Sequence, residues 1–145
     1  MKRTLVGNPR AVTSCLMALV LALVVGGSAA AAQEATVDLS TTMGRGRACT
    51  QWFYDREFSK IEALGMTPAV TDAIASVGGL DGFRDTVESQ LGAEVEVVDE
   101  AETKEQGLDV YTRTARFEKF AGDIGVQWVF DADGKLAGFG IRPKQ

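Results

Sequence analysis

The spacing of apolar residues changes at Gly92, and this change constrains the fold more than any other feature of the chain. Before Gly92, apolar side chains recur every three or four residues, as one face of an amphipathic helix requires. After Gly92, they alternate with polar side chains, which is typical of strands with one buried face. Helices followed by antiparallel strands predict an α+β domain, in which N-terminal helices pack on one face of a mainly four-stranded antiparallel sheet.

Four helices are expected before Gly92. Ser40 or Thr41 caps a helix that runs to about Tyr54, although Gly44 and Gly46 weaken it by about 1 kcal/mol each. The second is a short helix from Phe58 that ends at Gly65, and the third starts at Thr67-Pro68. The fourth is capped by Ser76 and closed by Gly92. Its apolar face consists of Val77, Leu80, Phe83, Val87 and Leu91.

Four strands are expected near residues 93–101, 107–118, 124–131 and 135–142. Asp133-Gly134 is typical of a two-residue hairpin turn, which places Trp128 opposite Phe139 and Phe130 opposite Ala137. The helical half of the sequence is the only apolar material that can cover the buried face of the last two strands. That face consists of Ile124, Val126, Trp128, Phe130, Ala137, Phe139 and Ile141.

The second expected strand contains Arg113, whose neighbours at alternate positions are bulky or apolar. Alternation therefore aims its guanidinium at the helices. One interpretation is an anion-binding arginine at the floor of a pocket. The other is a structural arginine whose head meets a helix carboxylate such as Asp55 or Glu88, which is the more common use of a buried arginine. The candidate pocket residues are Arg113, Tyr111, Trp128, Trp52 and Tyr54.

The residue types point away from most catalytic chemistry. The sequence contains no histidine, which removes the commonest metal ligand and the commonest general base. Cys49 is expected to be a small buried residue of the first helix. Glu94, Glu96 and Glu100 are expected on the outer face of the sheet, in a solvated surface paired across strands. No catalytic residue, metal ligand set or cofactor is therefore predicted.

The N-terminal segment has the three parts of a secretory signal peptide. A cationic start is followed by an apolar run, Ala11–Val25, that is short for a membrane span, and then by small residues. Cleavage is expected near Ala31 or Ala32, which gives a secreted, periplasmic or cell-envelope protein with no stable membrane span; an uncleaved anchor helix is the alternative. The expected organisation is a signal peptide at 1–32, a flexible lead-in at 33–38 and a single domain at 39–145.

The charge of the chain argues against nucleic acid and anionic membranes as partners. The chain has 15 basic and 20 acidic residues, and the expected signal peptide contains three of the basic residues and none of the acidic ones. The remainder therefore carries a net charge near −8. Nucleic acids and anionic membranes are bound through patches of lysine and arginine, and no such cluster occurs in the sequence.

Three segments carry a family resemblance. They are GRACTQWFY at 46–54 followed by Glu57-Phe58, VYTRTARF at 110–117 with Val126–Trp128, and Gly138–Pro143. Together they resemble a small bacterial secreted domain of unknown function, similar to the nuclear transport factor two-like superfamily and found alone or N-terminal to serine hydrolase or beta-lactamase-like domains. The resemblance implies a cone-like fold, with a curved sheet wrapped around helices. It implies no particular chemistry, because the superfamily contains binding proteins, dimerisation modules and enzymes.

Three functions follow as expectations. The first is an exported, non-catalytic binding or protein-interaction module, whose partner is a small molecule or an envelope protein; the family resemblance suggests a serine hydrolase. The second is a small pocket enzyme, of lyase or isomerase type, that uses a carboxylate and a tyrosine. The third is a structural module that forms a homodimer. The first is favoured because the sequence offers no nucleophile with a partner base.

Overall fold

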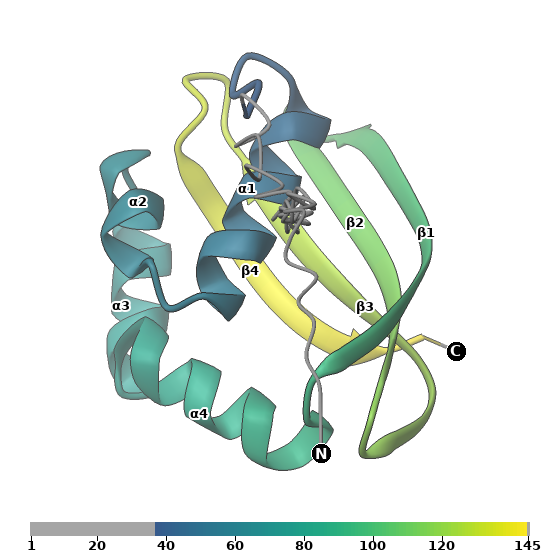
Figure 1. Cartoon of the computed structure of the whole chain (residues 1–145). Coiled ribbons are helices and arrows are strands. Elements are labelled where there is room, and N and C mark those ends of the chain that lie inside the picture. The colour runs from purple at the N-terminus through teal and green to yellow at the C-terminus, as the bar shows by residue number, and fades with distance from the viewer. Residues whose placement is uncertain (1–36, 145) are drawn as a thin grey trace, which may run out of the picture. The chain divides into compact units, whose positions relative to one another are not determined.

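The computed structural model describes residues 37–144, where four helices precede four strands (Figure 1). In chain order they are α1 (Thr42–Tyr54), α2 (Phe58–Ala63), α3 (Pro68–Ser76), α4 (Gly79–Leu91), β1 (Glu94–Glu105), β2 (Leu108–Phe117), β3 (Phe120–Phe130) and β4 (Leu136–Pro143). The strands form one antiparallel sheet in the order β1-β2-β3-β4. The expected signal peptide, its cleavage site and most of the expected lead-in lie outside the described residues.

Capping explains where α1 and α3 begin. The Thr41 hydroxyl accepts a hydrogen bond from the Gly44 amide at 3.0 Å, which confirms one of the two predicted caps. Pro68 occupies the first turn of α3, as predicted, where a helix needs no amide hydrogen from it.

The prediction that Ser76 caps the fourth helix is wrong. Ser76 is the last residue of α3, and its hydroxyl donates to the Ala73 carbonyl at 2.6 Å. Gly78 and Gly79 follow with φ of 86° and 81°, a left-handed conformation that glycine adopts without steric strain and that ends α3. α4 therefore begins at Gly79, and Val77 is 50 % exposed instead of joining the apolar face of α4.

The hairpin between β3 and β4 has a three-residue loop and not the predicted two-residue loop. The Asp131 amide donates to the Lys135 carbonyl, and the Gly134 amide donates to the Asp131 carbonyl, both at 2.9 Å. Gly134 has a φ of 79°, as the last position of this kind of loop requires.

A bulge next to this loop restores the predicted register. Ala137 is an extra residue in β4, so Phe130 pairs with Leu136, and the predicted pairing of Phe130 with Ala137 is wrong. Beyond the bulge, the predicted pairing of Trp128 with Phe139 is confirmed. Leu136 therefore takes the fully buried position that was expected for Ala137.

Strand β1 contains two bulges, at Val95 and Val98, and each shifts the alternation of side chains by one residue. Glu94 and Glu100 therefore lie on the helix side of the sheet, whereas Glu96, between the bulges, lies on the other side. The prediction that all three glutamates are on the outer face is wrong for Glu94 and Glu100. The partners that reveal the bulges are Glu94↔Phe117, Glu96↔Arg116, Val97↔Ala115 and Asp99↔Thr114.

The helices cover one face of the curved sheet, which confirms the predicted α+β arrangement (Figure 1). α1 contacts β1, β2 and β3, and α3 contacts β4. Between α1 and the sheet, the fully buried Trp128 donates from its indole nitrogen to the Thr50 hydroxyl at 2.9 Å and stacks on Phe139 with 3.8 Å between ring centroids. Across residues 37–144, no helix is both long and apolar enough to cross a bilayer.

Candidate functional site

Arg113 lies at the centre of a group of charged side chains between α1 and the first two strands. From β2, its Nε donates to Oε2 of Glu94 at 3.1 Å, its Nη2 donates to the other oxygen of Glu94, and its Nη1 donates to Oε1 of Glu100 at 3.2 Å. The Arg113 side chain is 19 % exposed and the Glu94 side chain 11 %. A guanidinium this far removed from water needs such partners.

Arg47 from α1 and two tyrosines complete this group. Arg47 donates through Nε and Nη2 to Oε2 of Glu100, at 3.0 and 2.7 Å. The Tyr111 hydroxyl donates to Glu100 at 2.5 Å, and the Tyr54 hydroxyl donates to Glu94 at 2.9 Å. Two arginines balance two glutamates, so the group has no net formal charge. We call it the arginine–glutamate cluster: Arg47, Tyr54, Glu94, Glu100, Tyr111 and Arg113.

The partners of Arg113 differ from those predicted. Arg113 is paired internally, as its structural interpretation requires, but both carboxylates come from β1 and neither comes from a helix. Asp55 instead accepts a hydrogen bond from Gln51, and Glu88 pairs with Arg56 and Arg84. The bulges in β1 are the physical reason, because they turn two strand glutamates toward the helices.

The cluster shifts the pKa values of its members. Hydrogen bonds from Arg47, and to a smaller degree from Tyr111, hold the pKa of Glu100 below its ordinary value although burial opposes this shift. Burial raises the pKa values of the Tyr54 and Tyr111 hydroxyls, and the neighbouring carboxylates raise them further. Burial works against the charge of Arg113, but its hydrogen bonds with Glu94 raise its pKa.

Glu100 is expected to make the folded protein sensitive to acid. Because its pKa is lower in the folded protein than in the unfolded chain, its stabilising effect is complete above the ordinary pKa of 4.5 and is lost as the pH falls below that value. We expect the urea midpoint to decrease between about pH 5 and about pH 3, and to decrease less in Glu100→Gln. An equally steep decrease in Glu100→Gln would show that other carboxylates cause the effect.

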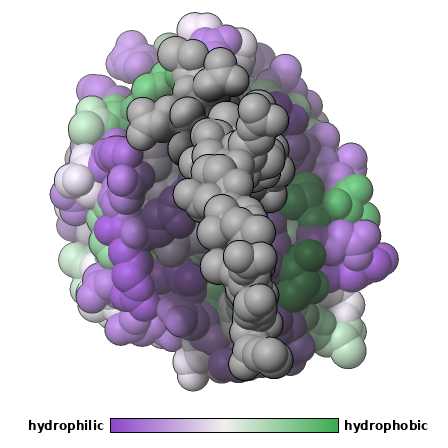
Figure 2. Space-filling view, viewed as in Figure 1, coloured by the Kyte–Doolittle hydropathy of each residue, from purple (hydrophilic) through white to green (hydrophobic). Residues whose placement is uncertain are grey.

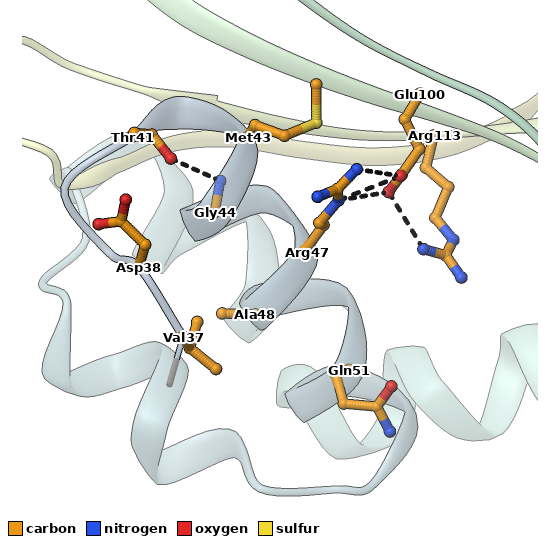
Figure 3. Close-up of a pocket in the computed structure, with 10 residues that line it drawn as sticks. All are labelled: Val37, Asp38, Thr41, Met43, Gly44, Arg47, Ala48, Gln51, Glu100 and Arg113. Atoms are coloured by element: carbon orange, nitrogen blue, oxygen red, sulfur yellow. Dashed lines mark hydrogen bonds and ion pairs between the residues drawn. The ribbon is translucent and has the colours of Figure 1, made fainter. Parts of the chain in front are cut away.

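Two cavities adjoin the arginine–glutamate cluster, and both are lined by Arg113 and Gln51. The larger cavity has a volume of about 540 Å³ and is lined by the segment before α1, by α1 itself, and by Glu100 and Arg113 of the sheet. Figure 3 shows its lining, with Arg47 from α1 and Arg113 from β2 both bonded to Glu100. The smaller cavity has a volume of about 240 Å³ and lies where α1, α4 and the start of β1 meet.

The structure brings the predicted pocket residues together only in part. Arg113 and Tyr54 line the smaller cavity. Tyr111 is fully buried and reaches the cluster through its hydroxyl. Trp128 is fully buried in the core, and Trp52 packs at the edge of the core; neither tryptophan lines the two cavities.

Sequence reasoning missed Arg47, Gln51 and Arg84 as cavity residues. Arg47 and Gln51 are four residues apart in α1, so they lie on the same side of the helix. That spacing was a usable signal for a polar strip along one side of the helix. Arg84 follows Phe83 in α4, and its burial has no comparable signal in the sequence.

The single described cysteine is buried, as predicted. Cys49 is fully buried, and burial raises the pKa of its thiol to about 12. A thiol with this pKa stays protonated near neutral pH, so it is a poor nucleophile. In the part of the chain that the structure describes, no three His, Cys, Asp or Glu side chains are grouped as metal ligands.

Comparison with known proteins adds no family to these observations. No protein-family model matches the chain, and neither curated proteins nor solved structures give a match. The resemblance of three segments to the nuclear transport factor two-like superfamily therefore stays a prediction. The function has to be inferred from the geometry of this chain.

Proposed function

We propose that this protein is an exported, non-catalytic binding module whose ligand occupies the larger cavity at Arg47, Glu100 and Arg113. The observation that carries the proposal is a cavity whose charged lining residues hold one another in place. Arg47 and Arg113 both form ion pairs with Glu100. The cavity volume of about 540 Å³ is within the range of small-molecule sites, roughly 300–1,000 Å³. The export part of the proposal is supported by the sequence of residues 1–32.

The pKa values of the cluster favour binding over acid–base catalysis. A general acid or base works best with a pKa near the working pH, which requires a raised glutamate pKa or a lowered tyrosine pKa. In the cluster, the pKa of Glu100 is lowered and those of Tyr54 and Tyr111 are raised. A lyase or isomerase that uses a carboxylate and a tyrosine is therefore the weaker alternative, although both residue types are in place.

Arg47 is the residue that we expect to contact the ligand. Its side chain is 57 % exposed, and within residues 37–144 its Nη1 makes no hydrogen bond. Glu100 holds the Nε and Nη2 edge of the guanidinium, so the remaining N–H groups have a fixed direction. Fixed guanidinium donors suit a carboxylate or phosphate oxygen. We therefore expect a ligand with an anionic group.

A thermal-shift screen of small carboxylates and organic phosphates tests this proposal. We expect at least one compound to raise the Tm of the native protein, because binding to the folded state adds stability by mass action. The shift should be lost in Arg47→Met. Arg116→Met is the matched control, since Arg116 is 53 % exposed and pairs with Glu96 on the other face of the sheet; it should keep the shift.

Two outcomes would contradict the proposal. One is a panel in which no compound raises the Tm of the native protein. The other is turnover of a compound that is abolished by Glu100→Gln, because turnover would identify the cavity as an active site.

A second candidate function is the docking of another protein on β1. Val95, Val97 and Val98 are 60, 43 and 42 % exposed on this edge strand, and Figure 2 shows hydrophobic residues on the side of the molecule where β1 lies. The acidic sequence of β1 disfavours a second copy of the chain, because antiparallel self-pairing would bring like charges together. An envelope protein, such as the serine hydrolase suggested by the resemblance, fits this surface better than a homodimer.

A further inference from the structure

Strand β4 is an edge strand whose outward backbone groups are unpaired over most of its length. In the sheet, β4 has only β3 as a neighbour (Figure 1). The Lys144 amide donates to the Asp123 carbonyl at 2.9 Å, which fixes the alternation of hydrogen-bonded pairs along β4. Phe139 and Ile141 therefore direct their N–H and C=O groups away from β3. Within residues 37–144, neither forms a backbone hydrogen bond with a helix or loop.

The chain itself already adds one residue to this edge. Met66 forms a parallel bridge with Leu136, the first residue of β4. The Leu136 amide donates to the Gly65 carbonyl, and the Thr67 amide donates to the Leu136 carbonyl, both at 2.9 Å. Pro68 then begins α3, so the chain leaves strand geometry. The edge of β4 therefore accepts an extended segment, and this pairing stops after one residue.

A cavity of about 370 Å³ lies on the helix side of this edge, between α3, α4 and β4. We call it the α3 cavity. Its side chains are all apolar and include Ala69, Ala73 and Val77 along α3, Phe83 of α4 and Phe139 of β4. The two alanines and Val77 recur every four residues and are exposed, so this side of α3 is open to a partner. The α3 cavity therefore suits an apolar side chain.

A second cavity, of about 310 Å³, lies on the opposite face of β4, and we call it the outer cavity. Gly138 and Gly140 contribute only backbone to it, so the face beside the edge is not blocked by side chains of β4. Gln127 and Arg142 supply polar groups. Arg142 is exposed and donates to Oε1 of Gln127 at 3.2 Å, and within residues 37–144 it forms no ion pair. The outer cavity therefore suits an acidic side chain.

We propose that β4 binds an extended peptide segment of another protein, which adds a fifth strand to the sheet. The outward backbone groups of Phe139 and Ile141 hold the segment. Successive side chains of a strand point to opposite faces, so one enters the α3 cavity and the next lies in the outer cavity near Arg142. The preferred segment therefore alternates apolar and acidic residues. An aliphatic ligand could fill the α3 cavity, but it would leave the backbone groups of the edge unpaired.

This binding surface is separate from the site of the proposed function. No member of the arginine–glutamate cluster lines the α3 cavity or the outer cavity. Binding of a peptide at β4 and binding of an anionic ligand at Arg47 can therefore be present or absent independently.

Hydrogen exchange, measured by NMR on the native protein with the peptide acetyl-TIEIEIT-amide, is the direct test. In the protein alone, we expect the amides of Phe139 and Ile141 to exchange faster than those of Gly140 and Arg142, which face β3. A saturating amount of peptide should slow the exchange of Phe139 and Ile141 at least about tenfold. The amides of Gly140 and Arg142 are the internal control and should change little.

Two alanines of α3 provide matched variants. Both Ala73 and Ala75 are exposed, but only Ala73 lines the α3 cavity. We expect the peptide to bind at least about tenfold more weakly to Ala73→Phe, whose ring fills the cavity, and to bind Ala75→Phe as it binds the native protein. Calorimetry measures both affinities. The basic peptide acetyl-TIKIKIT-amide should bind more weakly than the acidic one, and added salt should reduce this difference.

The proposal is overturned if the acidic peptide does not bind at about 1 mM, or if it binds without slowing the exchange of Phe139 and Ile141. It is also overturned if a folded Ala73→Phe binds the peptide as tightly as the native protein; the exchange measurement decides alone if that variant does not fold. Two other occupants would contradict it. One is decanoate, if it binds in an Ala73-dependent way and the peptide does not. The other is a second copy of the chain, if the two amides are protected in concentrated protein alone.

Discussion

Replacing Gly46 by alanine is expected to destabilise the protein by about 3 kcal/mol, at the upper end of what overpacking a core usually costs. A Cβ atom at this position would lie 2.1 Å from Cγ of Tyr111 and 2.2 Å from its Cδ1. Tyr111 is fully buried, and its hydroxyl is bound to Glu100, so the ring cannot move away without disturbing the arginine–glutamate cluster. Urea unfolding of Gly46→Ala and of the native protein measures the difference.

This result would be opposite in sign to the effect of helix propensity. Alanine favours a helix interior over glycine by about 1 kcal/mol, so propensity alone predicts that Gly46→Ala is stabilising. Gly140→Ala in β4 is the control, because apart from its chain neighbours no heavy atom of the described residues lies within 4 Å of a Cβ built there. We expect that variant to change stability only slightly. A stabilising Gly46→Ala would show that α1 can shift away from β2.

Arg113→Met is expected to cost about 3 kcal/mol, near the lower end of the range for breaking a buried ion pair because the Arg113 side chain is still 19 % exposed. Among residues 37–144, Glu94 would keep only its hydrogen bond from Tyr54. Glu100 would lose less, because it retains Arg47 and Tyr111. Chemical denaturation near neutral pH measures this cost.

The double variant Arg113→Met with Glu94→Gln separates two contributions to the lost stability. One is the loss of the guanidinium, and the other is the Glu94 carboxylate that is left buried without its ion-pair partner. The double variant should regain part of the lost stability, since a neutral amide replaces the uncompensated charge. An Arg113→Met protein as stable as the native one would mean that water replaces the guanidinium at Glu94.

The parts of the fold that could be predicted depend on local patterns. The apolar spacing around Gly92 located the helical and the strand halves, and Thr41 was recognised as a cap from its residue type. Ser76 has the same capping chemistry, but the pair Gly78-Gly79 moved the start of α4 by two residues. Residue type alone therefore did not distinguish a helix start from a helix end.

The candidate site was harder to predict because it depends on β1. The segment EVEV at 94–97 alternates regularly as a sequence, so nothing in it marks Val95 as a bulged residue. An undisturbed alternation puts Glu94 and Glu100 on the same side as Glu96. The bulges separate them, and only then do two strand carboxylates meet Arg113. Alternation did predict correctly that Arg113 faces the helices.

The short turns of the sheet have a consequence for the order of folding. Within the sheet, each strand pairs only with strands next to it in the chain, and Gln106-Gly107 and Glu118-Lys119 close two of the hairpins. These pairings close short loops, so their entropic cost is small. The bond between Arg47 and Glu100 joins residues 53 positions apart. Formation of the Arg47–Glu100 bond therefore indicates that α1 has docked on the sheet. A probe in the arginine–glutamate cluster would detect this docking step in a folding experiment.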